Sequence, residues 1–167
     1  MKECISLKGE LLRELQLVEL QILKDVTSFC EDNNIDYFLT SGTLLGAVRH
    51  GGFIPWDDDV DIAMPRKDFE HFLQLADRLP SDYCCQATRF DDHYPIPIVK
   101  IRKKGTVMKE PSMEHLDIEH GIWIDIFPLD RVCEKASVKK RAHMIHSITT
   151  AIGYKLGTAF PKKKTTI

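Results

Sequence analysis

Apolar residues recur along this chain with periods that predict alternating helices and strands. Three segments repeat them every three or four positions, as amphipathic helices do: Glu10 to Asn33, Lys67 to Leu79 and Glu134 to about Lys155. The apolar stripe of the first segment consists of Leu11, Leu15, Val18, Ile22, Val26 and Phe29. The inward face of the second consists of Phe69, Phe72, Leu73 and Ala76. The sequence therefore predicts three amphipathic helices.

Shorter apolar runs predict the strands. Thr40 to Thr43 is expected to form a turn before a short helix from Leu44 to His50, and Lys103 to Glu119 is expected to be a loop. The expected strands are Ile35 to Leu39, an acidic segment that stops at Met64-Pro65, Tyr83 to Phe90, Ile98 to Arg102, and Ile122 to Phe127, which Pro128 closes. This order of elements predicts an α+β or α/β domain with a small mixed sheet flanked by helices, and we favour α+β.

A single domain accounts for the whole pattern. The chain has 167 residues, which suits one domain with a core of its own. No linker and no internal repeat divides it. We expect the domain to occupy residues 1–155 and a patternless tail to follow over residues 156–167.

Composition and charge narrow the classes of protein. A hydrophobic fraction of 43% and a charged fraction of 29% are typical of soluble globular proteins. The formal charge of −2 gives no overall attraction to nucleic acid, so no nucleic-acid partner is expected. The five cysteines follow no zinc or redox spacing and are interpreted as reduced thiols. Without a signal-peptide pattern or a transmembrane segment, we expect a cytoplasmic protein that contacts membranes only peripherally.

The most informative chemistry is a run of four aspartates, Asp57, Asp58, Asp59 and Asp61. In a strand, side chains alternate between faces, so Asp59 and Asp61 would point the same way with Cα atoms about 6.5 Å apart. That spacing lets both carboxylates reach shared metal ions. Oxygen-only ligands favour Mg²⁺, with Mn²⁺ as the alternative, and such metals usually neutralise phosphates.

Asp125 lies in the middle of the apolar segment from Ile122 to Phe127. A lone aspartate there is most simply an exposed edge-strand residue or one held by a lysine. An ionised side chain is costly to bury without a compensating charge. A metal site completed by Asp59, Asp61 and Asp125 would compensate all three carboxylates at once. The condition is that the two strands be neighbours.

Neighbouring residues offer ways to hold a phosphate or a ligand. Ser41, Gly42 and Thr43 lie between a strand and a helix, where glycine and free amides admit an anion, although plain turns of this kind are common. Arg49 and Lys100 are candidate phosphate ligands, against the commoner interpretation as surface residues. Further candidates by type are His50, Arg102, Trp56 and Trp123.

Two of these neighbours are aromatic, and one alternative metal site exists. Trp56 and Trp123 flank the acidic segments and can stack on a base or cover a quaternary ammonium, or simply pack in the core or at its rim. Trp123 shares a strand face with Asp125. An acidic and histidine-containing stretch, Glu114 to His120, matches no usual zinc pattern and ranks below the magnesium site.

Two long segments resemble the hallmarks of the LicD family of bacterial phosphorylcholine transferases, which is related to the fukutin group. The first is Ser41-Gly42-Thr43-Leu44-Leu45-Gly46-Ala47-Val48-Arg49-His50-Gly51-Gly52-Phe53-Ile54-Pro55-Trp56-Asp57-Asp58-Asp59-Val60-Asp61. The second is Gly121-Ile122-Trp123-Ile124-Asp125-Ile126-Phe127-Pro128-Leu129-Asp130. The resemblance extends from about Leu12 to Val132.

The resemblance implies a nucleotidyltransferase-like fold with a defined site. It assigns the glycine motif to Gly42-Thr43, the carboxylate pair to Asp59 and Asp61, and the third carboxylate to Asp125. Family members usually have a further C-terminal region, so this chain is expected to be a C-terminally truncated member.

The resemblance also implies a reaction. We expect a magnesium-dependent phosphotransferase that moves phosphocholine from CDP-choline, or another alcohol phosphate from its CDP-alcohol, to a hydroxyl of a cell-surface glycan precursor such as teichoic acid or lipopolysaccharide. The open alternatives are transfer of ribitol phosphate, glycerol phosphate or a nucleotide on the same fold, and a non-catalytic fragment that binds nucleotide or glycan.

Overall fold

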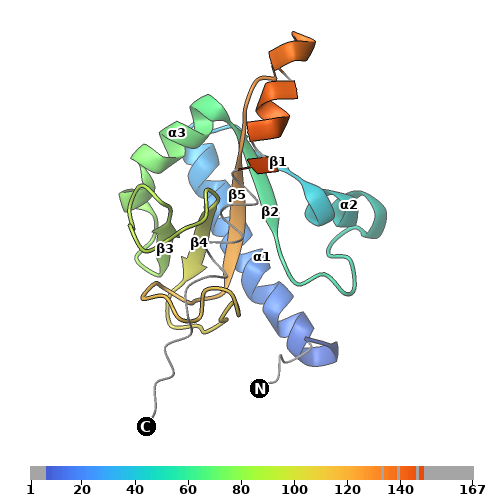
Figure 1. Ribbon diagram of the computed structural model, residues 1–167. Coiled ribbons are helices and arrows are strands. Elements are labelled where there is room, and N and C mark those ends of the chain that lie inside the picture. Colours follow the sequence, from blue (N-terminus) through green and yellow to red (C-terminus); the bar gives the residue numbers. More distant parts are fainter. Residues whose placement is uncertain (1–6, 133, 139, 146, 149–167) are drawn as a thin grey trace.

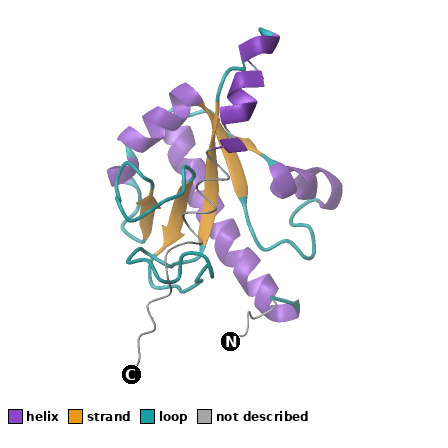
Figure 2. Cartoon of the chain, viewed as in Figure 1, coloured by secondary structure: helices purple, strands orange, loops and turns teal. Residues whose placement is uncertain are grey.

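The computed structural model describes residues 7–132, 134–138, 140–145 and 147–148. The elements within this part are α1 (Gly9–Asp32), β1 (Phe38–Leu39), α2 (Ser41–His50), β2 (Asp61–Pro65), α3 (Arg66–Gln74), the 3-10 helix η1 (Ala76–Arg78), β3 (Tyr83–Gln86), β4 (Val99–Lys103) and β5 (Trp123–Leu129). Residues 136–138, 140–145, 147 and 148 are also helical (Figure 2). The predicted helix over 134–155 is confirmed at the described positions from 136 to 148 but begins two residues later than predicted, and the rest of it lies outside the described residues.

The described strands form a five-stranded mixed sheet in the order β1-β2-β5-β4-β3. β2 and β5 run parallel, and the other three neighbouring pairs are antiparallel. The central pair is therefore made by two segments about sixty residues apart in the sequence, with Asp61 opposite Asp125. The predicted small mixed sheet flanked by helices is confirmed.

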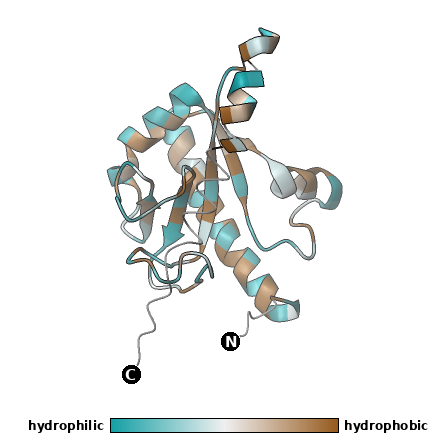
Figure 3. Ribbon diagram, in the orientation of Figure 1, coloured by the Kyte–Doolittle hydropathy of each residue, from teal (hydrophilic) through white to brown (hydrophobic). Residues whose placement is uncertain are grey.

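One face of this sheet carries the core. The inward positions of the strands alternate, as Ile62 and Met64 do in β2 and Ile124 and Ile126 do in β5. α1 and α3 cover this face (Figure 1), and the ribbons of both helices alternate apolar and polar positions in Figure 3. Their core residues are Ile22, Val26, Cys30, Phe69, Phe72 and Leu73. The opposite positions of the same strands are left for polar groups, which include Asp61, Lys100, Arg102 and Asp125.

Tertiary packing corrects several predicted details of the helices. Leu11 is 48% exposed, and the buried face of α1 instead runs through Leu12, Leu15, Gln16 and Glu19. α2 begins at Ser41, so the predicted turn residues 41–43 are its first turn. The predicted helix over 67–79 is divided into α3 and η1.

Strand boundaries also differ from the prediction. β2 begins only at Asp61, so Asp57, Asp58 and Asp59 precede it in a loop. β3 ends at Gln86, because residues 87–90 turn back through a bond from Phe90 N to Ala87 O of 2.9 Å. β5 continues through Pro128 to Leu129. At the proline it still pairs with β2, but β4 pairs with it only as far as Ile126, so one side of the strand is open there.

One further sequence expectation, the long loop after β4, is met. Residues 104–122 contain no helix or strand and form a loop beneath the sheet in Figure 2. In the described part of the chain, none of the helices combines the length and the apolar character that a membrane span requires.

Candidate active site

Parallel pairing of β2 and β5 places two of the three predicted carboxylates, Asp61 and Asp125, in register. The backbone N–H of Asp125 also donates to Val60 O at 2.8 Å. This bond holds Val60, the residue between Asp59 and Asp61, against β5. The geometric condition set by the sequence, that the two acidic strands be neighbours, is met.

The carboxylates repel one another within a partly dry site. Burial raises the pKa of Asp59 to about 6, and the charges of Asp61, Asp57, Asp58 and Asp125 contribute to this rise in that order. Burial also raises the pKa of Asp61, against a hydrogen bond from Ser41 that lowers it. A site that disfavours its own negative charges in this way is one that a cation stabilises.

Lys100 supplies the cation nearest to Asp125. Its Nζ lies 2.9 Å from Asp125 Oδ1 and 3.5 Å from Glu110 Oε1. The ammonium also sits 4.2 Å from the centroid of the Trp123 ring, whose Nε1 donates to Asp125 Oδ2 at 3.2 Å. At 4% exposure Lys100 is buried, so the structure places this predicted cation inside the site and not on the surface. Trp123 is confirmed on the face of Asp125.

Arg102 fixes the other side of Trp123. It is fully buried, with its guanidinium 4.7 Å from the Trp123 ring centroid. It donates to Gln86 Oε1 at 2.7 Å, Gly121 O at 2.9 Å and Glu110 Oε2 at 2.7 Å. Because these bonds tie the long loop to β3, Lys100 and Trp123 are held in one orientation beside Asp125.

The glycine motif is tied directly to the acidic segment. Thr43 Oγ1 accepts a bond from Asp61 N at 2.8 Å, and Thr40 N donates to Asp61 O at 3.2 Å. A Cβ built on Gly42 would lie 2.6 Å from Asp57 Oδ2. Ser41 adopts a positive φ of 48°, which is uncommon outside glycine and aligns the start of α2 with the carboxylates. The structure therefore brings Ser41, Gly42 and Thr43 to the site.

Two predicted ligand residues stand apart from it. Arg49 is exposed in the last turn of α2, with its Nε 3.4 Å from His50 Nδ1. Trp56 is 73% exposed. Within the described ranges no contact joins either side chain to the three carboxylates, so their proposed roles in binding stay predictions.

The chemistry of the three carboxylates and the backbone register of Asp61 and Asp125 suit a divalent cation. The positions of their side chains do not form a site for one. Among residues 7–148 as described, no three His, Cys, Asp or Glu side chains stand close enough together to hold an ion, and this includes the stretch from Glu114 to His120. Asp125 Oδ1 is buried and ion-paired with Lys100, yet it makes no hydrogen bond. Apart from Lys100, this oxygen therefore has no polar partner among the described residues.

Two polar residues on the buried face of α1 were not predicted from the sequence. Gln16 donates through Nε2 to Asp57 O at 2.9 Å and Ile54 O at 3.4 Å, which holds the acidic loop from behind. Glu19 is 1% exposed, and its Oε2 has no hydrogen-bond partner among the described residues. The sequence signal that could have revealed them is their spacing. Gln16 and Glu19 share one helical face with Leu12, Leu15 and Ile22, and polar residues on an apolar face are unusual enough to suggest a specific role.

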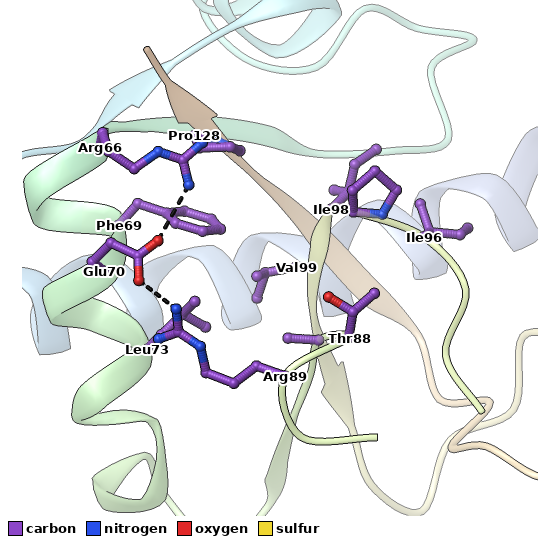
Figure 4. A pocket seen from close by; sticks show the side chains of 12 residues that line it. Arg66, Phe69, Glu70, Leu73, Thr88, Arg89, Ile96, Ile98, Val99 and Pro128 are labelled. Carbon is purple, nitrogen blue, oxygen red and sulfur yellow. Dashed lines mark hydrogen bonds and ion pairs between the residues drawn. The ribbon is translucent and has the colours of Figure 1, made fainter. Parts of the chain in front are cut away.

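A cavity of about 260 Å³ lies away from the carboxylates. It lies between α3 and residues 87–99 and is open to solvent, and Figure 4 shows Glu70 at its wall, bridging Arg66 and Arg89. Its floor is formed by Phe69, Leu73, Ile98 and Val99. Since its cations are already paired, nothing in this cavity competes with the carboxylate cluster as the chemical centre.

Fold and site together define a mixed α/β domain with acidic residues on, and directly before, its two parallel central strands. The family model described as "LicD/FKTN/FKRP, nucleotidyltransferase domain" matches residues 34–165. The chain belongs to this LicD family, as its two motifs predicted.

Curated relatives match the chain in shorter stretches. It is 52% identical over 64 residues to the lipopolysaccharide cholinephosphotransferase LicD of Haemophilus influenzae, a match that covers 38% of this chain and 24% of that relative. It is 44% identical over 50 residues to the ribitol 5-phosphate transferase FKRP of Homo sapiens, covering 30% and 10%. It is 28% identical over 114 residues to mannosyltransferase regulator 4 of Saccharomyces cerevisiae, covering 63% and 9%. The chain thus matches at most about a quarter of each of these relatives.

Proposed function

We propose that this chain is a LicD-type transferase that moves phosphocholine, or a related alcohol phosphate, from a CDP-alcohol to a hydroxyl of a cell-surface glycan precursor. Two relatives bear names of alcohol-phosphate transferases, one for cholinephosphate and one for ribitol 5-phosphate. The observation that carries the proposal is the register of Asp61 against Asp125, with Asp59 two residues before Asp61.

The proposed cofactor is Mg²⁺, with Mn²⁺ as its substitute. Asp59, Asp61 and Asp125 would hold it, because carboxylate oxygens are the ligands that these ions prefer. The ion would neutralise the charge that develops on the diphosphate as CMP leaves.

The protein's own groups account for the remaining steps. The acceptor hydroxyl attacks phosphorus as CMP departs, and Asp61 or Asp125 takes its proton. Lys100 beside Asp125 supplies positive charge near the transferred phosphate. The first turn of α2, tied to Asp61 through Thr43, offers backbone amides to a phosphate oxygen. These steps take place in the cytoplasm, with any contact at the inner membrane face peripheral.

The test is incubation of the protein with Mg²⁺, candidate glycans and a panel of CDP-choline, CDP-ribitol and CDP-glycerol, followed by mass spectrometry. Release of CMP with a glycan product heavier by one alcohol phosphate is expected. Release of pyrophosphate from a nucleoside triphosphate would instead identify nucleotidyl transfer.

Ribitol phosphate or glycerol phosphate transfer is the second candidate, and the match to the ribitol 5-phosphate transferase favours it. The two alcohols use the same carboxylate centre, so the donor that turns over fastest in the panel decides between them. A non-catalytic binding fragment predicts a different outcome: calorimetric binding of a CDP-alcohol with Mg²⁺ and no product after hours.

A further inference from the structure

The helical segment that follows β5 is exposed along its whole described length. Every described residue from 129 to 148 is exposed, including the helical residues 136–138, 140–145, 147 and 148. In Figure 1 this orange-red segment stands at the top of the molecule, beyond the end of β5. An isolated helix of this length is only marginally stable in water, so the segment calls for a partner that covers it.

Apolar side chains are concentrated in this segment. The stretch from Leu129 to Ile148 holds six of the fifteen large apolar side chains that are exposed among the described residues. Val138 and Ile145 are seven positions apart and Ile148 follows three positions later, so the three share one helical face, which Met144 widens. Single exposed apolar residues need no explanation, but a continuous face of them indicates a binding surface.

The opposite face of the same helix is polar and partly basic. Lys140, His143 and Ser147 are spaced by three and four positions, which places them opposite Val138. Arg141 lies within the apolar face, where its long stem lets the guanidinium extend to a polar boundary. The stretch 134–141 contains the single acid Glu134 and four cations, Lys135, Lys139, Lys140 and Arg141. Since the whole chain has a formal charge of −2, this positive charge is local.

We propose that the segment from Leu129 to Ile148 binds the surface of an anionic lipid bilayer, with its helix lying in the plane of the headgroups. Val138, Met144 and Ile148 enter the boundary between headgroups and acyl chains, and the cations contact lipid phosphates. An anionic bilayer complements both the apolar and the basic face. A second copy of the chain would cover the apolar face but would bring two sets of cations together, which like-charge repulsion disfavours.

The position of the segment suits such a contact. Asp61 begins β2 and Asp125 lies in the first half of the parallel strand β5, whereas the helix follows the other end of β5, at Leu129. A bilayer against the helix therefore meets the end of the sheet opposite to the carboxylates and leaves them clear. The inference goes beyond the proposed function and does not depend on it.

The test is co-sedimentation of the full chain with vesicles of phosphatidylcholine alone and of phosphatidylcholine mixed with phosphatidylglycerol. Ile148→Glu removes part of the apolar face, and Lys140→Glu reverses one charge of the basic face. The matched controls lie elsewhere on the surface. Phe90→Glu replaces an apolar side chain that is 50% exposed, as Ile148 is, and Lys109→Glu reverses the charge of an exposed lysine.

We expect the wild type to bind the mixed vesicles at least about 10-fold more tightly than the neutral ones, and to lose most of this preference in high salt. Ile148→Glu and Lys140→Glu should each weaken binding about 10-fold, and both controls should bind like the wild type. A wild type that ignores the mixed vesicles overturns the proposal, as do variants that bind as well as their controls. Neither result affects the proposed transfer reaction, because no substrate is present.

Hydrogen exchange provides a second measurement on the unmodified protein. Mixed vesicles are expected to slow amide exchange in the peptide that spans residues 134–148 and to leave α3 unchanged. Slow exchange in this peptide that needs no vesicles and increases with protein concentration would identify a second copy as the partner and overturn the proposal.

Discussion

At the scale of single residues, charge compensation decides the properties of this site. Asp125 is partly buried between Lys100 and Trp123, whereas Asp59 and Glu19 have acids as their main charged neighbours. The same cluster therefore contains one paired carboxylate and several that are left to repel one another. Variants that remove a carboxylate and variants that remove the lysine should consequently have opposite effects on stability.

Replacement of Asp61 by asparagine should separate activity from folding. We expect alcohol-phosphate transfer to fall by at least about 100-fold, because a proposed metal ligand is lost. Stability without metal should hold or rise, since one repelling charge is removed. CMP release and thermal unfolding in EDTA are the measurements. Substantial turnover in the Asp61→Asn variant would refute the assigned role. Asp58→Asn is the control, because Asp58 is exposed.

Replacement of Lys100 by methionine should destabilise the fold by about 3 kcal/mol, because Asp125 is left buried without its cation. Chemical denaturation measures the change, and Lys109→Met is the exposed control. The double variant with Asp125→Asn should recover most of the loss, as the unpaired charge is then absent. A single variant as stable as the wild type would show that this ion pair contributes nothing.

At the scale of elements, short connections fix the site. α2 begins where β1 ends, and its first turn is bonded to the start of β2, so the acidic loop is held at both ends. Gly46 makes this loop possible: a Cβ there would lie 2.5 Å from Gly52 O. At Gly42 the nearest atom is instead the end of the Asp57 side chain, at 2.6 Å.

These two glycines should therefore respond differently to alanine. Gly46→Ala should lower the free energy of unfolding by about 2 kcal/mol, because the backbone itself must move. Gly42→Ala should cost less than about 1 kcal/mol, since a side chain rotates away, yet it should lower transfer activity by displacing Asp57. Denaturation curves and CMP release test the pair. Equal stability losses at both positions would contradict the contacts.

At the scale of the whole molecule, the acidic cluster makes stability depend on pH. The folded-state pKa of Asp59 is about 6 against an ordinary 3.8, and that of Glu19 is about 9 against 4.5. For acids with raised pKa, the folded state binds more protons than the unfolded state, so stability falls as pH rises through these windows.

In EDTA we therefore expect the melting temperature to fall steadily between pH 4.5 and pH 9. Glu19→Gln should remove the part of this fall above pH 6. Added Mg²⁺ should raise the melting temperature more at pH 8 than at pH 5, because the ionised carboxylates bind it more tightly. Scanning calorimetry across this range is the measurement; a melting temperature that rises with pH in EDTA would contradict it.

The sequence by itself determined the helices, the existence of the strands, and three acidic residues predicted to share one site. Apolar periodicity is local, and the cost of charge in an apolar run can be read at Asp125 without knowing its neighbours. The two long motifs were also sufficient to predict membership of the LicD family.

Only the tertiary structure decided which groups meet. Pairing of β2 with β5 set Asp61 opposite Asp125, and pairing of β4 with β5 set Lys100 there as well. The burial of Glu19 likewise depends on which face of α1 packs against the sheet. Strand register and helix rotation are fixed by contacts between segments distant in the chain, and no local pattern encodes them.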